Sequence, residues 1–252
     1  MAAGISKAIF RILREPEHQM DLLPIILGTT RPRPPSKQSA DAAPADKKMP
    51  VALKTRIFER DGHTCRYCGF LSRKYQEINF LNGERDDWSE KNLVTACIFC
   101  QQCFVMDEIS AMRSGVLLWL PEIEQNDLHH IARAIYVARI SQGPVADAAR
   151  KALDSLMTRR EEAKKRISTD NPYILSTVLR DYLGSKHYEM RAKKLKGVRV
   201  FPLDRRIIKE ADLEFNQFPQ ILAYWRSKDG PFGGKAPLQW ISLYKEIMSK
   251  AA

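Results

Sequence analysis

IFERDGHTCRYCG at residues 57–69 and WSEKNLVTACIFCQQC at residues 88–103 contain all five cysteines of this 252-residue chain. Each stretch holds a C-x2-C pair, which presents two thiolates from one tight turn. Gly69 follows the first pair, where such a turn favours a residue without a β-carbon. A tetrahedral zinc ion needs four thiolates at about 2.3 Å, so the two pairs predict a closed, structural Zn²⁺ site. The predicted metal ligands are Cys65, Cys68, Cys97 and Cys100.

Cys103 leaves the ligand set open, because Cys100 and Cys103 are themselves spaced as a C-x2-C unit. We expect Cys97 and Cys100 to be the ligands, with Cys103 either replacing one of them or remaining a buried thiol. A redox switch, in which these thiols exchange zinc for a disulfide bond, is a further alternative. The remaining interpretation is a cluster of free buried thiols, and two matched spacings speak against it.

The composition is that of a globular protein with an acidic partner. Hydrophobic residues make up 44% and charged residues 28% of the chain, and 41 Lys and Arg against 30 Asp and Glu give a net charge of +11. That charge suits nucleic acid, anionic lipid or an acidic protein, and does not choose among them. No stretch approaches the roughly 20 apolar residues that cross a bilayer, so we expect no membrane insertion. Arg11 and Arg14 interrupt the apolar N-terminus, which argues against a secretory signal. The cysteine pairs favour a reducing, cytoplasmic location.

Four segments divide the chain. Residues 1–28 form an N-terminal extension with a helix over 1–19 and a strand over 21–27, although Met20 is an alternative start. Residues 29–49 are rich in Pro, Ala, Ser and charge, which predicts a flexible linker. Residues 50–110 form the zinc domain and residues 111–252 a mainly helical domain. The expected helices cover 50–61, 121–140, 145–167, 170–184, 185–196 and the residues from 237. The expected strands cover 75–81 and 198–203, and residues 116–120 form either a buried strand or the entry to the next helix.

The two cysteine stretches resemble the halves of the HNH, or ββα-metal, nuclease domain. In that family Arg-Asp-Gly-x-x-Cys-x-x-Cys-Gly opens the module, and Glu-Asn-Leu-Val-x-x-Cys-x-x-Cys opens its helix. Asn92 stands at the family's central asparagine. The resemblance implies an α+β fold, in which a small zinc-bound ββα domain precedes the helical part.

The same resemblance predicts that catalysis is lost. The family carries a histidine base at the end of the first strand and further metal ligands beyond the second cysteine pair. Asn79 and Phe80 stand at the histidine positions, and Gln101 stands where His or Asn completes the catalytic metal site. None of the five histidines lies between the cysteine pairs; they are His18, His63, His129, His130 and His187. We therefore expect no enzymatic activity and no catalytic residues.

The histidines outside that interval offer no replacement. His63 precedes Cys65 and is most simply a surface residue or a neighbour of the metal ligands. His129 and His130 are consecutive on a predicted helix, so they point in different directions and make a poor metal pair. At most one of them is expected to face the site.

A closer resemblance is to the IcmJ (DotN) family of the Dot/Icm type IVB secretion system. It is carried by RIFERDGHTCRYCGFLSRKYQEINFLNG, KNLVTACIFCQQCF and LLWLPEIEQNDL, within about residues 55–140. It implies a structural zinc and a cytoplasmic subunit, associated with the inner membrane through the secretion complex. It also implies binding to the C-terminal extension of the coupling ATPase DotL and effector recruitment together with the adaptor pair IcmS–IcmW.

The alternative is an HNH-type DNA-binding protein or endonuclease. Basic runs at 191–199 and 159–166 motivate it, but RREEAKKR at 159–166 alternates in sign, as solvated helix faces do. Nucleic acid is therefore the less favoured partner. The aromatic residues around the cysteines are Tyr67, Phe70, Phe80, Phe99 and Phe104. They are expected either to pack a small core or to form a groove for a partner helix. No partner-binding residue is assigned.

Overall fold

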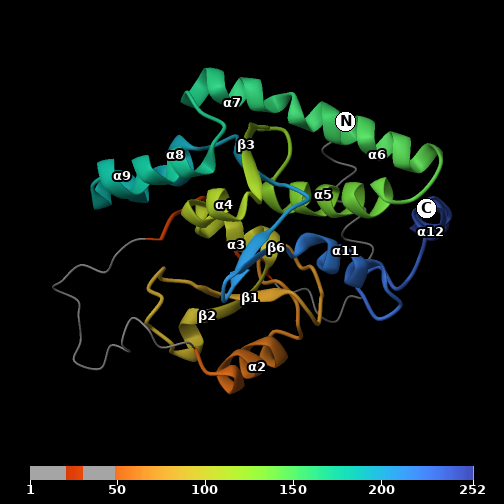
Figure 1. The fold of residues 1–252 in the computed structure, drawn as a ribbon, viewed down its shortest axis with the longest axis horizontal. Coiled ribbons are helices and arrows are strands. Elements are labelled where there is room, and N and C mark those ends of the chain that lie inside the picture. The colour runs from red at the N-terminus through yellow and green to blue at the C-terminus, as the bar shows by residue number, and fades with distance from the viewer. Residues whose placement is uncertain (1–20, 31–48, 252) are drawn as a thin grey trace.

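The computed structural model describes residues 21–30 and 49–251, in which helices combine with three two-stranded antiparallel sheets (Figure 1). The fold is therefore mixed α/β. The strands are β1 (Gln76–Phe80), β2 (Leu93–Cys97), β3 (Gly115–Trp119), β4 (Val198–Pro202), β5 (Ile207–Glu210) and β6 (Leu213–Asn216). The helices are α2 (Val51–Arg60), α3 (Ile98–Phe104), α4 (Met106–Met112), α5 (Gln125–Arg139), α6 (Pro144–Met157), α7 (Arg159–Ile167), α8 (Pro172–Thr177), α9 (Ser185–Glu189), α10 (Arg191–Lys194), α11 (Phe218–Arg226) and α12 (Pro237–Ala251).

The first sheet is built around the second cysteine pair. β1 runs antiparallel to β2, with Gln76 opposite Cys97 and Phe80 opposite Leu93, and α3 begins directly after β2. α2 packs beneath this sheet because Leu53 and Ile57, one helical turn apart, share a buried cluster with residues of both strands. The order of these elements is strand, strand, helix.

The second sheet joins two distant parts of the chain. β3 pairs with β4 from Gly115 opposite Pro202 to Trp119 opposite Val198, so residues 120–197 lie between its strands. Gly197 precedes β4 with a φ of +94°, and a β-carbon there would lie 2.8 Å from the Trp119 ring. Only glycine fits this approach without a shift of the neighbouring ring.

Residues 21–30 form an extended segment, here called the N-terminal strap. Its backbone bonds to two separate places: the Leu23 N–H donates to the Arg66 carbonyl at 2.8 Å, and the Gly28 N–H donates to the Cys103 carbonyl at 2.8 Å. Leu27 is buried in the core. The strand predicted over 21–27 is wrong, because the hydrogen bonds of this segment go to loop and helix carbonyls and form no ladder.

Several other expectations need correction. The helix predicted over 145–167 is two helices, α6 and α7, which meet at Thr158, whose hydroxyl donates to the Ser155 carbonyl at 2.7 Å. The helix predicted over 170–184 is α8 followed by a π-helical turn, Val178–Tyr182 (η4), and that over 185–196 is split into α9 and α10. The helix expected to open at the Asn-Leu-Val motif begins later: Glu90–Asn92 form a single turn (η3), and the following residues form β2.

The strands predicted near 75–81, 116–120 and 198–203 are confirmed as β1, β3 and β4. The helices predicted over 50–61, over 121–140 and from 237 are confirmed as α2, α5 and α12. Among the described residues, the elements without a predicted range of their own include β2, α4, the β5–β6 hairpin and α11. The helix predicted over 1–19, Met20 and residues 31–48 of the predicted linker lie outside the described residues.

The largest buried cluster contains both the cysteines and the helical part of the chain. It joins Cys65, Cys68, Cys97 and Cys100 to Leu128 and Ala132 of α5 and to Ile221 and Trp225 of α11. A second cluster, which holds Cys103 and Leu27, lies under α4, α7 and α8. The cysteine pairs are therefore part of a core that both halves of the chain build.

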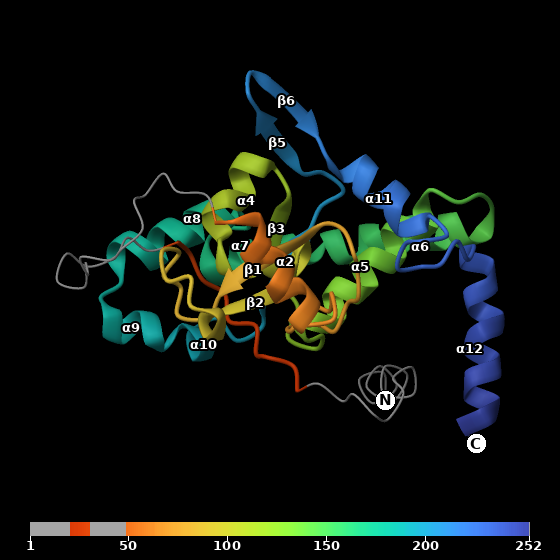
Figure 2. The same cartoon turned by 90° about the horizontal axis from the view of Figure 1, so that it is seen from below.

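Two elements extend from the body of the molecule (Figure 2). One is the β5–β6 hairpin, and the other is α12, which exposes four large apolar side chains, Leu238, Ile241, Tyr244 and Met248. None of the helices within residues 21–30 and 49–251 is both long and apolar enough to cross a membrane.

Candidate metal centre

The first cysteine pair lies in a tight turn of the loop between α2 and β1. The Gly69 N–H donates to the Cys65 carbonyl at 2.8 Å and closes the turn, and Gly69 adopts a φ of +71°, which favours glycine. The Cys65 N–H donates to the Phe70 carbonyl at 3.0 Å. This arrangement holds Cys65 and Cys68 on the same side of the loop.

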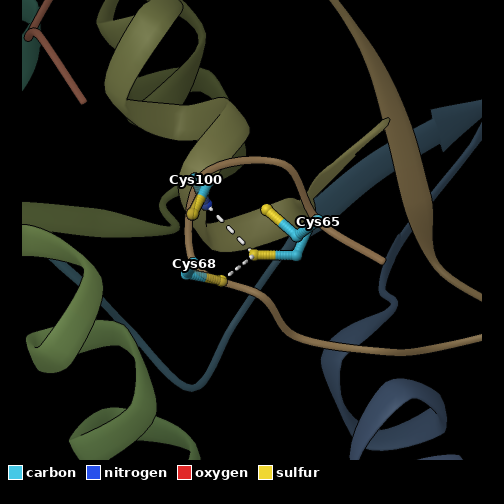
Figure 3. A group of neighbouring side chains, drawn as sticks. Cys65, Cys68 and Cys100 are labelled. Atoms are coloured by element: carbon cyan, nitrogen blue, oxygen red, sulfur yellow. Dashed lines mark hydrogen bonds between the residues drawn. The ribbon is translucent and has the colours of Figure 1, made fainter. Parts of the chain in front are cut away.

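The second pair spans the junction of β2 and α3. Cys97 is the last residue of β2 and caps α3, where its Sγ accepts the Cys100 N–H at 3.4 Å. The Arg66 N–H donates to the Thr95 carbonyl at 2.9 Å, which fixes the first loop against β2. The strand, the helix start and the loop thus bring the two pairs together, and Figure 3 shows Cys65 and Cys68 of the first pair beside Cys100 of the second.

The four sulfurs have the spacing of a metal site. They lie within 4.8 Å of one another, all four residues are buried, and the Cys68 and Cys97 sulfurs are 3.7 Å apart. A tetrahedral ion with sulfurs at about 2.3 Å sets neighbouring sulfurs about 3.8 Å apart. A disulfide bond would require about 2.05 Å, and all five cysteines are free thiols. The four cysteines are therefore close enough to bind one metal ion.

Cys103 lies outside this group. It is buried one turn further along α3, its Sγ is 3.8 Å from the Phe99 carbonyl, and it packs in the second cluster. Cys100 rather than Cys103 thus lies with Cys65, Cys68 and Cys97, and the assignment of these four as metal ligands stays a prediction.

Helix α5 presents a polar stripe to the cysteines. Arg133 is fully buried, and its Nη2 donates to the Cys97 sulfur at 2.7 Å and approaches the Cys68 sulfur at 3.7 Å. The guanidinium carbon lies 4.0 Å from the Phe70 ring centroid and 5.0 Å from that of Phe99. Sequence reasoning missed Arg133. Its spacing of four from His129 and of eight from Gln125, on a helix with an apolar face, is the signal that points to it.

His129 is held as a neutral donor. Its Nδ1 lies 3.2 Å from the Cys100 sulfur, and its Nε2 lies 2.8 Å from the Gln125 amide nitrogen. Gln125 is oriented by β4, because its oxygen accepts the Val200 N–H at 2.9 Å and its nitrogen donates to the Val200 carbonyl. The Nε2 of His129 therefore accepts a hydrogen bond and its Nδ1 carries the proton. Burial, aided by the charge of Arg133, lowers the pKa of His129 to about 3.

His130 also reaches the cysteine loop, contrary to the expectation that at most one of the two histidines faces the site. Its Nε2 donates to the Cys68 carbonyl at 2.8 Å. Consecutive side chains point about 100° apart around a helix, and the cysteine loop is broad enough to meet both directions. His63 is placed elsewhere, with its ring stacked on Phe58.

Burial sets the protonation of the thiols. It raises the pKa of Cys65, Cys100 and Cys103. Burial also raises the pKa of Cys68 and Cys97, but hydrogen bonds from Cys100 and Cys65 and the positive charge of Arg133 bring it below the ordinary value. The thiolates nearest Arg133 are thus the ones that the protein itself stabilises.

The structure places the residues that the resemblance to HNH domains singles out in and around the first sheet. Asn79 is buried and donates to the Tyr67 hydroxyl. Asn92 ties the loop between β1 and β2, because its oxygen accepts the Asn82 N–H at 2.9 Å and its nitrogen donates to the Asp87 carbonyl. Phe80 and Gln101 line a cavity of about 450 Å³. In the described part of the chain, no histidine lines this cavity.

Comparison with known proteins finds sequence similarity to a protein of a bacterial secretion apparatus. No protein-family model matches it. Over 155 residues it is 31% identical to the type 4 apparatus protein DotN of Legionella pneumophila, an alignment that covers 60% of this chain and 72% of that protein.

Proposed function

The chain belongs to the DotN (IcmJ) family of type IV secretion apparatus proteins, and on that premise we propose that it is a non-catalytic, zinc-stabilised scaffold of a Dot/Icm coupling complex. The observation that carries the proposal is the four-sulfur group, buried in a core that both halves of the chain build. Such a site stabilises a fold and offers no open coordination position to a substrate.

The zinc assignment rests on the donor set. Four cysteine sulfurs in a tetrahedral arrangement favour zinc or an iron–sulfur centre over magnesium, calcium or copper(II). Zinc would be held by Cys65, Cys68, Cys97 and Cys100, and it would supply a redox-inert cross-link between the loop and α3. Metal analysis of protein purified without added metal is expected to give one zinc per chain. A metal-free but folded protein would contradict the assignment.

The absence of catalysis is proposed from an HNH-like arrangement of β1, β2 and α3 that has lost its acid–base chemistry. Phenylalanine at position 80 neither accepts a proton nor binds a cation, and Asn79 is committed to Tyr67. We expect plasmid DNA to remain intact with Mg²⁺ or Mn²⁺ at protein concentrations that retain full zinc. Cleavage that persists in a preparation free of contaminating nuclease, and that disappears with Cys65→Ser, would revive the endonuclease.

The proposed partner is the C-terminal extension of the DotL-like coupling ATPase, through which the protein joins IcmS–IcmW in recruiting effectors at the inner membrane. Family membership supports this partner, and the charge of +11 suits an acidic one. The test is a pull-down of the cognate coupling ATPase by this protein. It compares the full-length ATPase with an ATPase that lacks its C-terminal extension. Retention should require the extension, and equal binding to both would remove the proposal.

Nucleic-acid binding remains the second candidate because exposed basic residues gather on α9, α10 and the turn before β4. Lys186, Lys193, Lys194 and Lys196 are all exposed. The run over 159–166 does not add to them, since Lys164 pairs with Glu161 at 2.8 Å and Lys165 pairs with Glu162 at 3.1 Å. Binding to duplex DNA that weakens steeply with salt would favour this candidate.

A further inference from the structure

Arg133 is a buried cation whose partners are sulfurs. It is 1% exposed, and its Nη2 makes the contacts to Cys97 and Cys68. Its Nε and Nη1 have no hydrogen-bond partner in the described part of the chain, and the faces of the group are covered by Phe70, Phe99 and Trp225. No carboxylate forms an ion pair with it among these residues. The charge of Arg133 is therefore balanced by the cysteine group or by nothing.

A buried, unpaired charge is strongly unfavourable, whereas a charge with a buried counter-charge is tolerated. Neutral thiols offer no such counter-charge, and a bound metal ion would keep all four cysteines as thiolates. A divalent ion with four thiolates carries a formal charge of −2, which Arg133 would partly neutralise. A metal ion bound by the four cysteines would thus also offset the cost of burying the charge of Arg133.

The geometry ties α5 to the site at more than one point. Arg133 donates to the Cys97 sulfur and His129 donates to the Cys100 sulfur, so each sulfur of the second pair has a donor from the same helix. His130 adds a bond to the Cys68 carbonyl. Gln125 extends the chain of hydrogen bonds from His129 to β4. These contacts join the cysteines to two elements, α5 and β4, that both follow them in sequence.

We infer that Arg133 is the fixed counter-charge of the metal–thiolate group, so that bound metal holds α5, and with it the helical half of the chain, against the cysteine site. The inference rests on the proposed zinc site and extends it: zinc occupancy controls the docking of α5 as well as the fold of the cysteine loop. Arg133 acts here as a positioning residue, because it touches the sulfurs and not the metal.

The test compares Arg133→Met, which keeps the length and removes the charge, with Arg133→Lys, which keeps the charge. Arg139→Met is the matched control, since Arg139 lies on the same helix and pairs with Asp204 instead of the cysteines. Removing the hydrogen-bond donor of a metal ligand typically weakens metal binding about 10–100-fold. Competition with a zinc chelator should show that loss in Arg133→Met, a smaller loss in Arg133→Lys and none in Arg139→Met.

Cobalt(II) substitution gives a readout that a loss of packing would not move. A donated hydrogen bond and a nearby positive charge stabilise the sulfur lone pairs, which raises the energy of the sulfur-to-cobalt charge-transfer band. Arg133→Met should therefore shift this band to longer wavelength, and Arg133→Lys should restore part of the shift. Unchanged zinc affinity together with an unchanged band in Arg133→Met would overturn the inference while leaving the zinc site intact. Wild-type protein that binds no metal would overturn both.

Hydrogen exchange of the wild-type protein tests the docking of α5 without any substitution. In the interval after chelator is added and before the circular dichroism signal falls, amide exchange should accelerate at least tenfold more in α5 than in α7, which packs on the second cluster through Ala163. Equal effects on the two helices, or an α5 that stays protected without metal, would contradict the inference even if Arg133→Met failed to fold.

Discussion

Cys65 and Cys97 each contribute one sulfur to the proposed site, from opposite pairs. Because an unfolded chain has no preformed site, the free energy of zinc binding becomes free energy of folding. We expect Cys65→Ser and Cys97→Ser to lose zinc and to unfold at ordinary temperature, as measured by metal content and circular dichroism.

Cys103→Ser is the matched control for that experiment, as it changes a buried cysteine of the second cluster. It should retain one zinc per chain and lose only a modest part of its stability. Zinc loss from Cys103→Ser as large as that from Cys100→Ser would show that the ligand set is wrong.

Asp61 is a buried carboxylate that fastens β2 to the loop after α2. Although burial raises its pKa, hydrogen bonds from Arg60 and from the Thr95 N–H outweigh that effect and place the pKa below the ordinary value. A depressed pKa in the folded state means that the stabilisation is complete at neutral pH. At pH 7 we expect Asp61→Asn to lower the free energy of unfolding by about 1–3 kcal/mol. Urea denaturation measures this loss. Glu59→Gln, at an exposed position, is the control, and its free energy of unfolding should change little.

The sequence was most informative about the site where a spacing encodes chemistry. The C-x2-C pairs identify the four sulfurs that the structure brings together, because the turn is local. Arg133, His129 and Gln125 could not be assigned in advance, since their roles depend on how α5, which begins only at Gln125, docks against cysteines that end at Cys103. The spacing of Gln125, His129 and Arg133 places them on one face of the helix, but it does not show which part of the protein that face contacts.

The N-terminal strap connects the cysteine loop with α3 and the helical part. Leu27 is buried among residues of the second cluster. Leu27→Ala should lower the free energy of unfolding by about 2–5 kcal/mol, because it leaves a cavity in the core. Thermal and urea unfolding measure the loss, and the half-buried Leu22→Ala provides the same chemical change with a smaller expected effect. Equal losses would mean that the strap does not depend on the Leu27 site.

The approach of β4 to β3 depends on Gly197. An alanine there would suffer both an unfavourable positive φ and contact with the Trp119 ring, whereas Gly143, with a φ of +75°, has open space around it. Strain at a positive φ costs about 1–3 kcal/mol, and the contact adds to that cost in Gly197→Ala alone. Gly197→Ala should therefore be clearly less stable than Gly143→Ala in thermal unfolding. Equal melting temperatures would show that the Trp119 ring moves aside freely.

At the level of elements, prediction worked where one segment decides its own structure. The amphipathic patterns of α2 and α5, the alternation of apolar and polar residues in β1 and the apolar runs of β3 and β4 are readable locally. The strand predicted for the N-terminal strap was wrong because its apolar residues suit a strand, but no strand of the described sheets pairs with it. The β5–β6 hairpin was missed because each of its strands has four residues, so the alternation of Leu213 and Phe215 with polar residues is too short to stand out.

The molecule as a whole is expected to unfold as one unit. Its largest cluster contains the cysteines together with α5 and α11, so neither half has a complete core without the other. Tryptophan fluorescence and far-ultraviolet circular dichroism should report a single, coincident transition, and chelation should lower its midpoint for both signals. Two separate transitions would favour the division into a zinc domain at 50–110 and an independent helical domain.

The pairing of β3 with β4 has a consequence for synthesis of the protein in the cell. The ribosome delivers the cysteine segment long before it delivers Val198, so a nascent chain can acquire its metal while the second sheet still lacks a strand. Contacts between such distant residues form late and slowly. We therefore expect a nascent chain to complete its cysteine group before Gly197 covers Trp119 and the second sheet closes.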